Sequence, residues 1–263
     1  MTPARRTATA AAVALLGVAA LTACEGSFVI ADGDTGPRET ISQDLTPVST
    51  VDIGTAGTMR VVVGDEPSLT ITAGEAVIDE ITAVVHGDTL AIDLPGTWIN
   101  TGRIEYELVM PALSSVVVRG SADVAGEIAP GDTATVSIDG SGDVDLTGAG
   151  RADQVAVDIE GSGEVTLDDL DAQQVDVAID GSGDVTLGGT TAVLGVRIPG
   201  SGTVDAGGLL AADVSVEIKG SGDARVHAEQ TLDVSIQGSG DVRYTGDPRL
   251  SEDIDGSGDV GPA

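Results

Sequence analysis

Residues 175–187 read Val-Asp-Val-Ala-Ile-Asp-Gly-Ser-Gly-Asp-Val-Thr-Leu, and this stretch decides the fold. Two short runs that alternate between apolar and polar residues flank a Gly-Ser-Gly centre. Alternation with a period of two is typical of a β-strand with one buried and one solvated face. Glycines suit a tight corner because they tolerate positive φ and let neighbouring backbones approach closely. The stretch therefore predicts a strand, a sharp corner and a second strand.

The same pattern recurs down the second half of the chain. The motif Gly-Ser-Gly-Asp-Val is intact at Gly140, Gly181, Gly238 and Gly256, and variants of it begin at Gly120, Gly161, Gly200 and Gly220. The first glycines of successive copies are 20, 21, 20, 19, 20, 18 and 18 residues apart. A fixed period in this range is the signature of a solenoid, in which each unit buries its apolar face by stacking on the next. We therefore predict an all-β protein, a parallel β-helix or β-solenoid with coils of about 20 residues.

The region before the repeats has strand-like runs without the motif. These runs span residues 59–63, 69–72, 81–85, 89–94 and 104–110, and turn-forming residues separate them. No long stretch has apolar residues at a spacing of 3.6, so we expect no helix after the N-terminal segment. Residues 47–263 are thus predicted to form one solenoid domain, with an irregular β-rich start and regular repeats over 114–260.

Composition narrows the function. Only 2% of the 263 residues are aromatic although 41% are hydrophobic, which suits a narrow, repetitive core of Val, Ile, Leu and Ala. The chain has 12 basic and 43 acidic residues, a net charge of −31. This balance excludes generic binding to nucleic acid, which depends on clustered Lys and Arg. It predicts an acidic, solvated exterior that keeps a β-rich rod soluble.

The N-terminus has the features of an export signal. Arg5 and Arg6 precede an apolar run at residues 8–20, which is too short to span a membrane. Leu21-Thr22-Ala23-Cys24 closes the run and resembles the lipobox of bacterial lipoproteins. The resemblance implies that residues 1–23 are a signal peptide and that Cys24 carries diacylglycerol with palmitate-type chains, anchoring the protein on the extracytoplasmic face of the cell membrane. The alternative is an ordinary signal peptide followed by an incidental cysteine.

Residues 24–46 are rich in Gly, Asp, Ser, Thr and Pro and show little periodicity. Such composition is typical of a flexible linker. We expect this segment to hold the folded domain away from the membrane.

The repeats and the stretch before them together resemble a known family. The Gly-Ser-Gly-Asp-Val copies, the run His86-Gly87-Asp88-Thr89-Leu90-Ala91-Ile92, the strand-like run at 104–109 and Pro111-Ala112-Leu113 carry the resemblance. They are similar to the head GIN domain family of bacterial auto-transporter adhesins over residues 48–260. The resemblance implies a β-helix-like protein of the cell surface or periplasm, and it supplies no catalytic residues.

An acidic column is the main candidate for chemistry. It follows the corner glycines and consists of Asp123, Asp143, Glu164, Asp184, Asp223, Asp241 and Asp259, with Thr203 interrupting it. Oxygen-rich stacks can bind Ca²⁺, which takes six to eight oxygen ligands. Repulsion between carboxylates at a strand spacing of about 4.8 Å is only about 1 kcal/mol per pair in water, so solvated side chains need no ion. Both explanations stay open, and no firm metal site is assigned.

Catalytic motifs are missing from the sequence. His86 and His227 lie far apart, and there is no His-Glu-x-x-His, phosphate-binding loop or Gly-x-Ser-x-Gly. Polysaccharide-acting β-helix enzymes are the rival class, but Trp98, Tyr106 and Tyr244 are the main aromatic candidates for a sugar platform. We therefore expect no enzyme and no cofactor. The expected function is a structural or adhesin-like module whose partner is a surface protein or a glycan.

Overall fold

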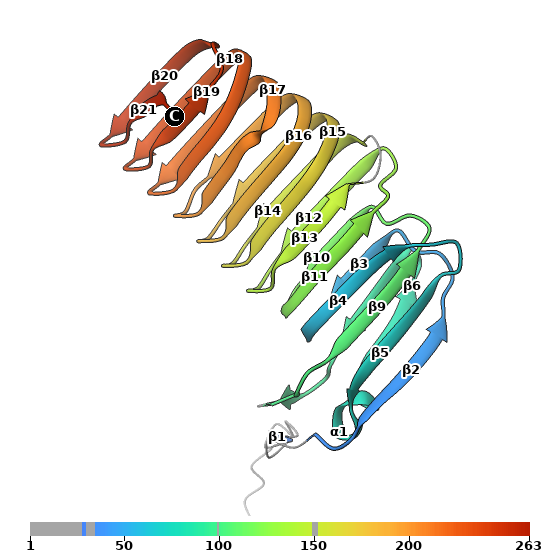
Figure 1. The fold of residues 1–263 in the computed structure, drawn as a ribbon. Helices are drawn as coiled ribbons and strands as arrows, with labels where there is room; N and C mark the ends of the chain where they lie inside the picture. The colour runs from blue at the N-terminus through green and yellow to red at the C-terminus, as the bar shows by residue number, and fades with distance from the viewer. Residues whose placement is uncertain (1–27, 30–34, 99, 149–151) are drawn as a thin grey trace, which may run out of the picture.

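The computed structural model describes residues 28–29, 35–98, 100–148 and 152–263, which form an elongated rod of stacked β-coils (Figure 1). The predicted β-solenoid is confirmed. The expected signal peptide and Cys24 lie outside the described residues. No helix in the described part of the chain has the length and hydrophobicity that a membrane crossing requires.

The first part of the rod is irregular. Its elements are β1 (Phe28–Val29), β2 (Arg38–Asp44), β3 (Thr50–Ile53), β4 (Ala56–Val63), β5 (Ser68–Gly74), α1 (Glu75–Ile78), β6 (Thr82–His86), β7 (Thr89–Asp93), β8 (Thr97–Trp98) and β9 (Glu105–Met110). The four-residue α1 corrects the expectation of no helix. Strand β2 pairs antiparallel with β5, so the flexible linker expected up to residue 46 is wrong for residues 38–44.

The repeats form the regular part. Their strands are β10 (Ser115–Val118), β11 (Ser121–Ile128), β12 (Thr133–Ile138), β13 (Val144–Gly148), β14 (Ala152–Ile159), β15 (Glu164–Ile179), β16 (Asp184–Ile198), β17 (Thr203–Gly220), β18 (Asp223–Gly238), β19 (Val242–Thr245), β20 (Arg249–Gly256) and β21 (Val260–Pro262). The four strands β15 to β18 run through most of a coil without interruption, where shorter pairs of strands make up the other coils.

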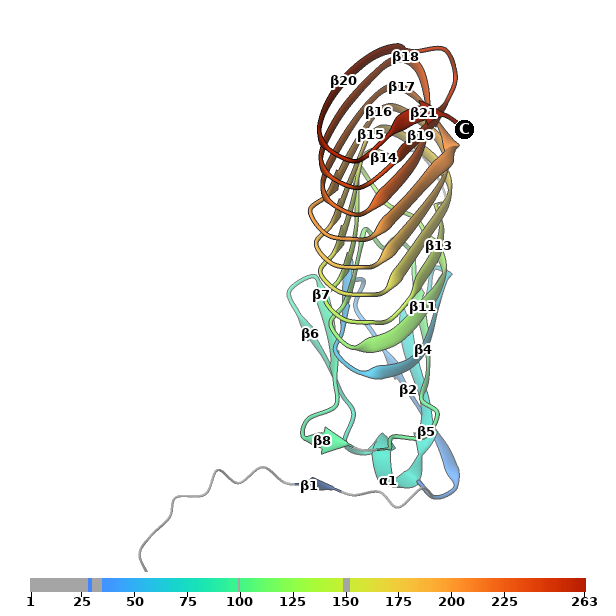
Figure 2. The same cartoon turned by 90° about the vertical axis from the view of Figure 1, so that its left-hand side faces the viewer.

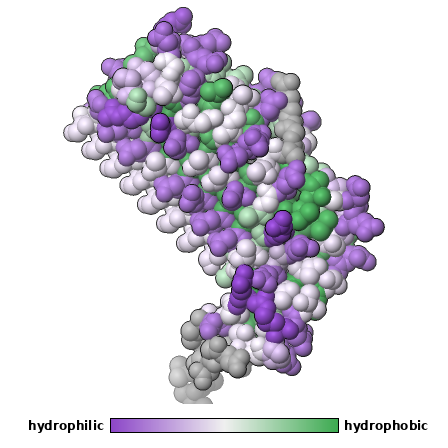
Figure 3. All heavy atoms as spheres, in the orientation of Figure 1, coloured by the Kyte–Doolittle hydropathy of each residue, from purple (hydrophilic) through white to green (hydrophobic). Residues whose placement is uncertain are grey.

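Each coil is a flattened oval with two walls, as the view along the rod shows (Figure 2). The strands that precede a Gly-Ser-Gly corner form wall B, which contains β10, β12, β14 and β20. The strands that follow the corner form wall A, which contains β11, β13, β19 and β21. The corners themselves make a regular pale ridge along the left edge of the rod (Figure 3).

Parallel pairing keeps equivalent repeat positions in line. In wall B, Val116 pairs with Val136, which pairs with Val157, and the column continues through Val177, Val196, Val216 and Val234. In wall A, Val124, Val144, Val165, Val185 and Val204 form the matching column. These side chains are buried between the walls. The core is therefore a stack of aliphatic layers, which the alternation in the sequence predicts.

The coils are not stacked in simple chain order at the N-terminal end. Strands β3 and β4 form a coil that pairs with β10 and β11 on one side and with β7 and β9 on the other. The chain thus forms the inner coil of β3 and β4 first and then passes through β5 and β6. It next forms the outer coil of β7 and β9, and returns to the inner coil to begin the repeats with β10 and β11. As a result β4 and β9, far apart in sequence, are neighbours in wall A.

Close approach between coils explains most of the corner glycines. A Cβ on Gly181 would lie 2.2 Å from the carbonyl oxygen of Gly161, and one on Gly200 would lie 2.2 Å from that of Gly181. Neither glycine has a positive φ. The backbone amide of each corner serine donates to the same carbonyls, as Ser182 does to Gly161 at 3.0 Å. The motif is therefore needed for stacking more than for an unusual backbone angle.

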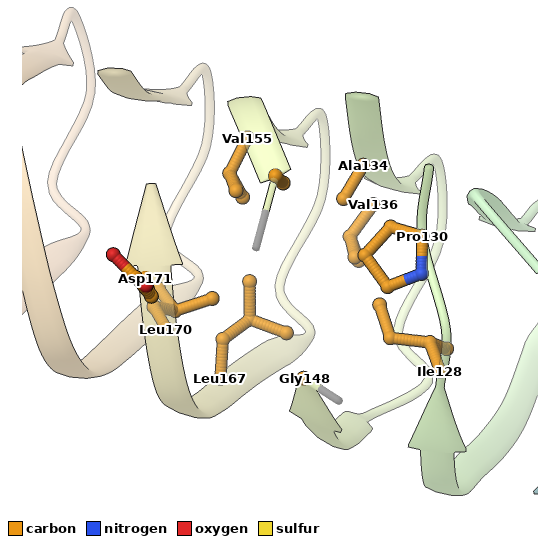
Figure 4. A pocket seen from close by; sticks show the side chains of 10 residues that line it. Ile128, Pro130, Ala134, Val136, Gly148, Val155, Leu167, Leu170 and Asp171 are labelled. Carbon is orange, nitrogen blue, oxygen red and sulfur yellow. The ribbon is translucent and has the colours of Figure 1, made fainter. Parts of the chain in front are cut away.

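One small void interrupts the layers near the start of the repeats. Ile128, Ala134, Gly148, Leu167 and Leu170 contribute to its lining (Figure 4), and its volume is about 20 Å³. This space is about that of one water molecule, and its walls are mostly apolar. It is a packing defect and too small for a ligand.

Candidate functional site

The acidic column runs along the outside of wall A, as the repeat predicts. Glu164 pairs with Asp184, Asp184 with Thr203, and Thr203 with Asp223. The acidic side chains of the column are exposed apart from Asp241, which is half-buried. Thr58 of β4 pairs with Asp123 and continues the column into the irregular part of the rod.

Four of the column's aspartates have a structural contact that the sequence did not indicate. A carboxylate oxygen of each accepts the backbone N–H of the next acidic residue: Asp143 to Asp123 at 3.3 Å, Glu164 to Asp143 at 3.1 Å, Asp241 to Asp223 at 2.8 Å, and Asp259 to Asp241 at 2.9 Å. These carboxylates therefore satisfy backbone donors from coil to coil.

The middle of the column is bonded differently. The amides of Asp184, Thr203 and Asp223 donate to the carbonyl oxygens of Gly163, Gly183 and Gly202, each at 3.2 Å. The preceding side chain is not needed as an acceptor here. This explains why Thr203 can interrupt the acidic series without leaving the amide of Asp223 unpaired.

No three His, Cys, Asp or Glu side chains come together as a metal-holding group within the described ranges. One oxygen on each of Asp123, Asp143, Asp223 and Asp241 is already engaged by an amide. Near the C-terminal end, Arg243 pairs with Asp259 at 2.6 Å and lies 3.7 Å from Asp241, and the hydrogen bond that Arg243 donates to Asp259 raises the pKa of Arg243. Calcium binding by the column and its solvation without an ion both stay predictions.

A groove opens in wall A at the junction between the repeats and the irregular part. It has a volume of about 600 Å³ and lies over β5, β9, β4 and β11. Its lining includes the small side chains Thr58, Thr70, Thr72 and Ala125, with the longer Arg60, Arg103, Glu105 and Glu107 among them. Strand pairing sets these in two rows, Thr72-Glu105-Thr58 and Thr70-Glu107-Arg60-Ala125. We call this site the junction groove.

The charges of the junction groove are partly paired. Glu105 accepts from Arg38 at 2.7 Å and from Arg103 at 2.8 Å, and Arg38 also donates to the carbonyl oxygen of Arg103 at 3.1 Å. Arg60 lies opposite Glu107 across the strands, yet neither side chain forms an ion pair with any described residue. The carboxylates of Glu105 and Glu107 thus lie near three guanidinium groups, those of Arg38, Arg60 and Arg103, although acidic residues greatly outnumber basic ones in the chain as a whole.

A buried polar pair supports the groove from inside. Tyr106 and Thr55 share a hydrogen bond of 2.8 Å between their hydroxyls, and both residues are buried. Burial raises the pKa of Tyr106, while the hydrogen bond from Thr55 acts in the opposite direction. Tyr106, one of the aromatic candidates for a sugar platform, is therefore buried and offers no open ring face.

The other aromatic and histidine candidates do not converge. Trp98 donates its indole N–H to the carbonyl oxygen of Pro95 at 3.0 Å and is packed partly against the core. His227 contacts the hydroxyl of Thr245 at 2.9 Å in β18, whereas His86 ends β6 in the irregular part. Tyr244 is also in the repeat region, in β19.

Sequence reasoning did not find the junction groove. Arg38, Arg60 and Arg103 are unremarkable in the sequence, and the antiparallel entry of β2 and the out-of-order pairing of β4 with β9 bring them together. Three of the chain's 12 basic residues lie in this motif-free region, which is no more than its share of the chain's length, so the sequence carries no signal for the groove.

Comparison with known structures shows the same fold in proteins of two bacteria. A "putative lipid binding protein" from Parabacteroides distasonis ATCC 8503 matches with a TM-score of 0.80 and 23% identity, over 89% of this chain and 99% of that one. A "putative adhesin" from Parabacteroides merdae ATCC 43184 matches with a TM-score of 0.76 and 19% identity, over 88% and 97%. No curated protein matches the sequence. At these identities the structural matches establish the fold alone.

The family model described as "Putative auto-transporter adhesin, head GIN domain" matches residues 48–248, which is most of the chain. The match includes the irregular coils as well as most of the repeats. The expected resemblance is thus confirmed, and the chain belongs to the head GIN domain family.

Proposed function

We propose that this protein is an exported lipoprotein of the cell envelope, anchored through Cys24, that acts as a non-catalytic, adhesin-like interaction module. The observation that carries the proposal is the rod itself. Among the described residues, 19 strands join in one continuous sheet system, with β1 and β8 paired apart from it, and the outer walls of the rod are long, polar and acidic. Such a shape offers an extended surface to a partner, and the family description points in the same direction.

The arrangement of the rod fits an N-terminal anchor. Strands β1 and β2 lie at one end of the rod, and β20 and β21 lie at the other (Figure 1). An anchor at Cys24 would therefore place the irregular part near the membrane and the last repeat farthest from it. The junction groove would lie between the two, on the side of the rod.

Non-catalytic action is supported by what the described side chains do. The acidic column hydrogen-bonds backbone amides, and the two histidines lie on different parts of the rod. A polysaccharide-acting enzyme remains the alternative function. Its proper test is product release from a polysaccharide panel.

The anchor is tested by metabolic labelling of cells with a palmitate analogue. We expect label on the wild-type protein and none on Cys24→Ala, because the thiol is the acceptor of the lipid. Ser27→Ala serves as the matched control, since it changes a nearby small polar residue and leaves the thiol in place. An unlabelled wild-type protein would refute lipid anchoring.

The interaction role is tested by capture from envelope extracts on immobilised protein. We expect the same glycan or surface-protein partners to be retained in repeated captures, and no product to be released from polysaccharides. Turnover of any polysaccharide by the purified protein would instead support the enzyme.

A further inference from the structure

We propose that the junction groove binds a carboxylated saccharide, that is, a glycan segment containing uronic acid. The proposal deepens the interaction role given above and rests on it for its physiological meaning. The class of ligand is inferred from the residues of the groove alone. A second hollow of similar size, lined by Asp44 and Glu66, carries acidic side chains without a basic one.

The shape of the groove follows from its residues. Thr70 and Thr72 of β5 line one side of the groove, and Ala125 and Gly126 of β11 line the other, so both sides carry short side chains or none. Glu107 of β9 and Arg60 of β4 lie between these sides as exposed cross-strand neighbours, and the exposed Arg103 precedes β9. A volume of about 600 Å³ lies within the range typical of small-ligand sites.

Arg60 and Arg103 supply the anion contact. Arg60 has no ion-pair partner among the described residues, and Arg103 is exposed and contacts Glu105 through its Nε at 2.8 Å, so a ligand can approach its guanidinium from the solvent. A guanidinium group presents a planar fork that matches a carboxylate. Glu105 holds Arg103 in place, because Arg38 fixes the same carboxylate from the other side at 2.7 Å.

The rest of the lining suits sugar hydroxyls. Thr58 is exposed, and its hydroxyl forms no hydrogen bond within the described structure, so it can donate and accept. The unpaired carboxylate of Glu107 accepts hydroxyl protons. The hydroxyls of Thr70 and Thr72, by contrast, already form hydrogen bonds with those of Ser42 and Thr40, respectively, each at 2.9 Å. These two threonines therefore make one side of the groove polar and fixed.

The surrounding charge favours one carboxylate over a denser anion. Glu107 lies in the groove, and Asp123 and Asp145 adjoin it through their pairing with Thr58 and Ala125. A phosphate or sulfate ester cluster would meet these three carboxylates at close range. A uronate carries a single charge beside several hydroxyls, so it satisfies the arginines with the least repulsion.

The groove has no exposed aromatic ring, because Tyr106 is buried beneath it. Each site should therefore bind weakly, and many copies on one surface would act together through multivalency. A polymer that carries many uronates is the appropriate probe.

The test is affinity electrophoresis of the purified full chain carrying Cys24→Ser through gels that contain polygalacturonate. We expect retardation that weakens with salt, as screening of an ionic contact requires. Arg60→Gln and Arg103→Gln should each weaken binding by about tenfold, the scale of one charge-assisted contact. Both side chains are exposed, and unchanged melting curves would confirm that the variants are folded.

Arg225→Gln is the matched control. Arg225 is also exposed on wall A and forms no ion pair with a described residue, but it lies in β18, well along the rod from the groove. It should bind polygalacturonate as the wild type does. Methyl-esterified polygalacturonate should not retard the wild type, since its carboxyl groups are uncharged esters.

Three outcomes would overturn the proposal: no retardation by polygalacturonate, equal loss on Arg225→Gln, or stronger retardation by dextran sulfate that the groove variants do not reduce. The last two would show nonspecific attraction between polyanion and arginine. None of them bears on the lipid label at Cys24, so failure of this inference is distinct from failure of the proposed function.

Discussion

Gly202 lies directly against Ile179 of the coil before it. A Cβ on Gly202 would sit 2.6 Å from Cγ2 of Ile179 and 2.4 Å from the carbonyl oxygen of Gly183. The same relation links Gly183 to Ile159 and Gly222 to Ile198. The third residue of the motif is therefore glycine because the inward-pointing isoleucine of the previous coil occupies the place of a side chain.

The aspartates of the column should differ in their contribution to stability. Asp223→Ala removes the acceptor for the amide of Asp241 and should lower the free energy of unfolding by about 1 kcal/mol. Asp184→Ala should change it little, because the next amide donates to Gly183 instead. Urea unfolding of both variants measures the difference. Equal losses would mean that the carboxylate contact contributes nothing specific.

Calcium should have little effect on stability. The column offers no cluster of three carboxylates in the described chain, and four of its members already accept an amide. We expect the same melting temperature in Ca²⁺ and in chelator at matched ionic strength. A saturable rise with Ca²⁺ would establish the cation site instead.

The buried hydroxyl pair under the groove should be strongly coupled. Tyr106→Phe leaves Thr55 buried without its partner and should cost about 1–3 kcal/mol. Thr55→Val in the same background should restore part of the loss, because both polar groups are then gone. A double-mutant cycle measures the coupling, and strictly additive losses would contradict it.

The burial of Tyr106 also leads us to expect a change in the stability of the fold at high pH. Its pKa is raised in the folded state by burial, so the folded protein holds the phenolic proton more tightly than the unfolded chain. The associated stability is complete below the unfolded pKa of about 10 and is lost as the pH rises through the folded pKa. Denaturant midpoints between neutral and alkaline pH should fall less in Tyr106→Phe than in the wild type. If the midpoints of the variant and the wild type fall equally, the ionisation of Tyr106 does not contribute to the loss of stability.

The repeat region could be predicted because the alternation within each repeat and the spacing between repeats indicate the same stacked strands. The spacing of motif glycines such as Gly140 and Gly161 equals the register offset between stacked strands, so alternation in the sequence gives the core directly. The junction groove could not be predicted in this way. It depends on β9 pairing with β4 at a separation of 47 positions, as between Thr58 and Glu105, and on β2 adding to β5. Nothing periodic marks either pairing.

The acidic column is an intermediate case. Its position on wall A follows from the period, whereas its hydrogen bonds to Asp143, Glu164, Asp241 and Asp259 depend on small shifts between coils. Sequence alone cannot distinguish a carboxylate that accepts an amide from one that is only solvated.

The central claim is that the recurring motif exists to stack coils, and paired glycine substitutions test it most directly. Gly202→Ala forces a Cβ into Ile179 and the Gly183 carbonyl, and it should lower stability by about 2 kcal/mol or more. Gly148→Ala is the control, because its φ is not positive and a Cβ there, next to the small void, would meet no atom of a described residue closer than 3.8 Å, its chain neighbours aside. It should raise stability by about 0.4–1 kcal/mol.

The melting temperatures of the two variants, compared with that of the wild type, test whether the motif glycines are needed to stack the coils. The account predicts shifts of opposite sign, down for Gly202→Ala and up for Gly148→Ala. Equal shifts, or a Gly202→Ala protein as stable as the wild type, would contradict it.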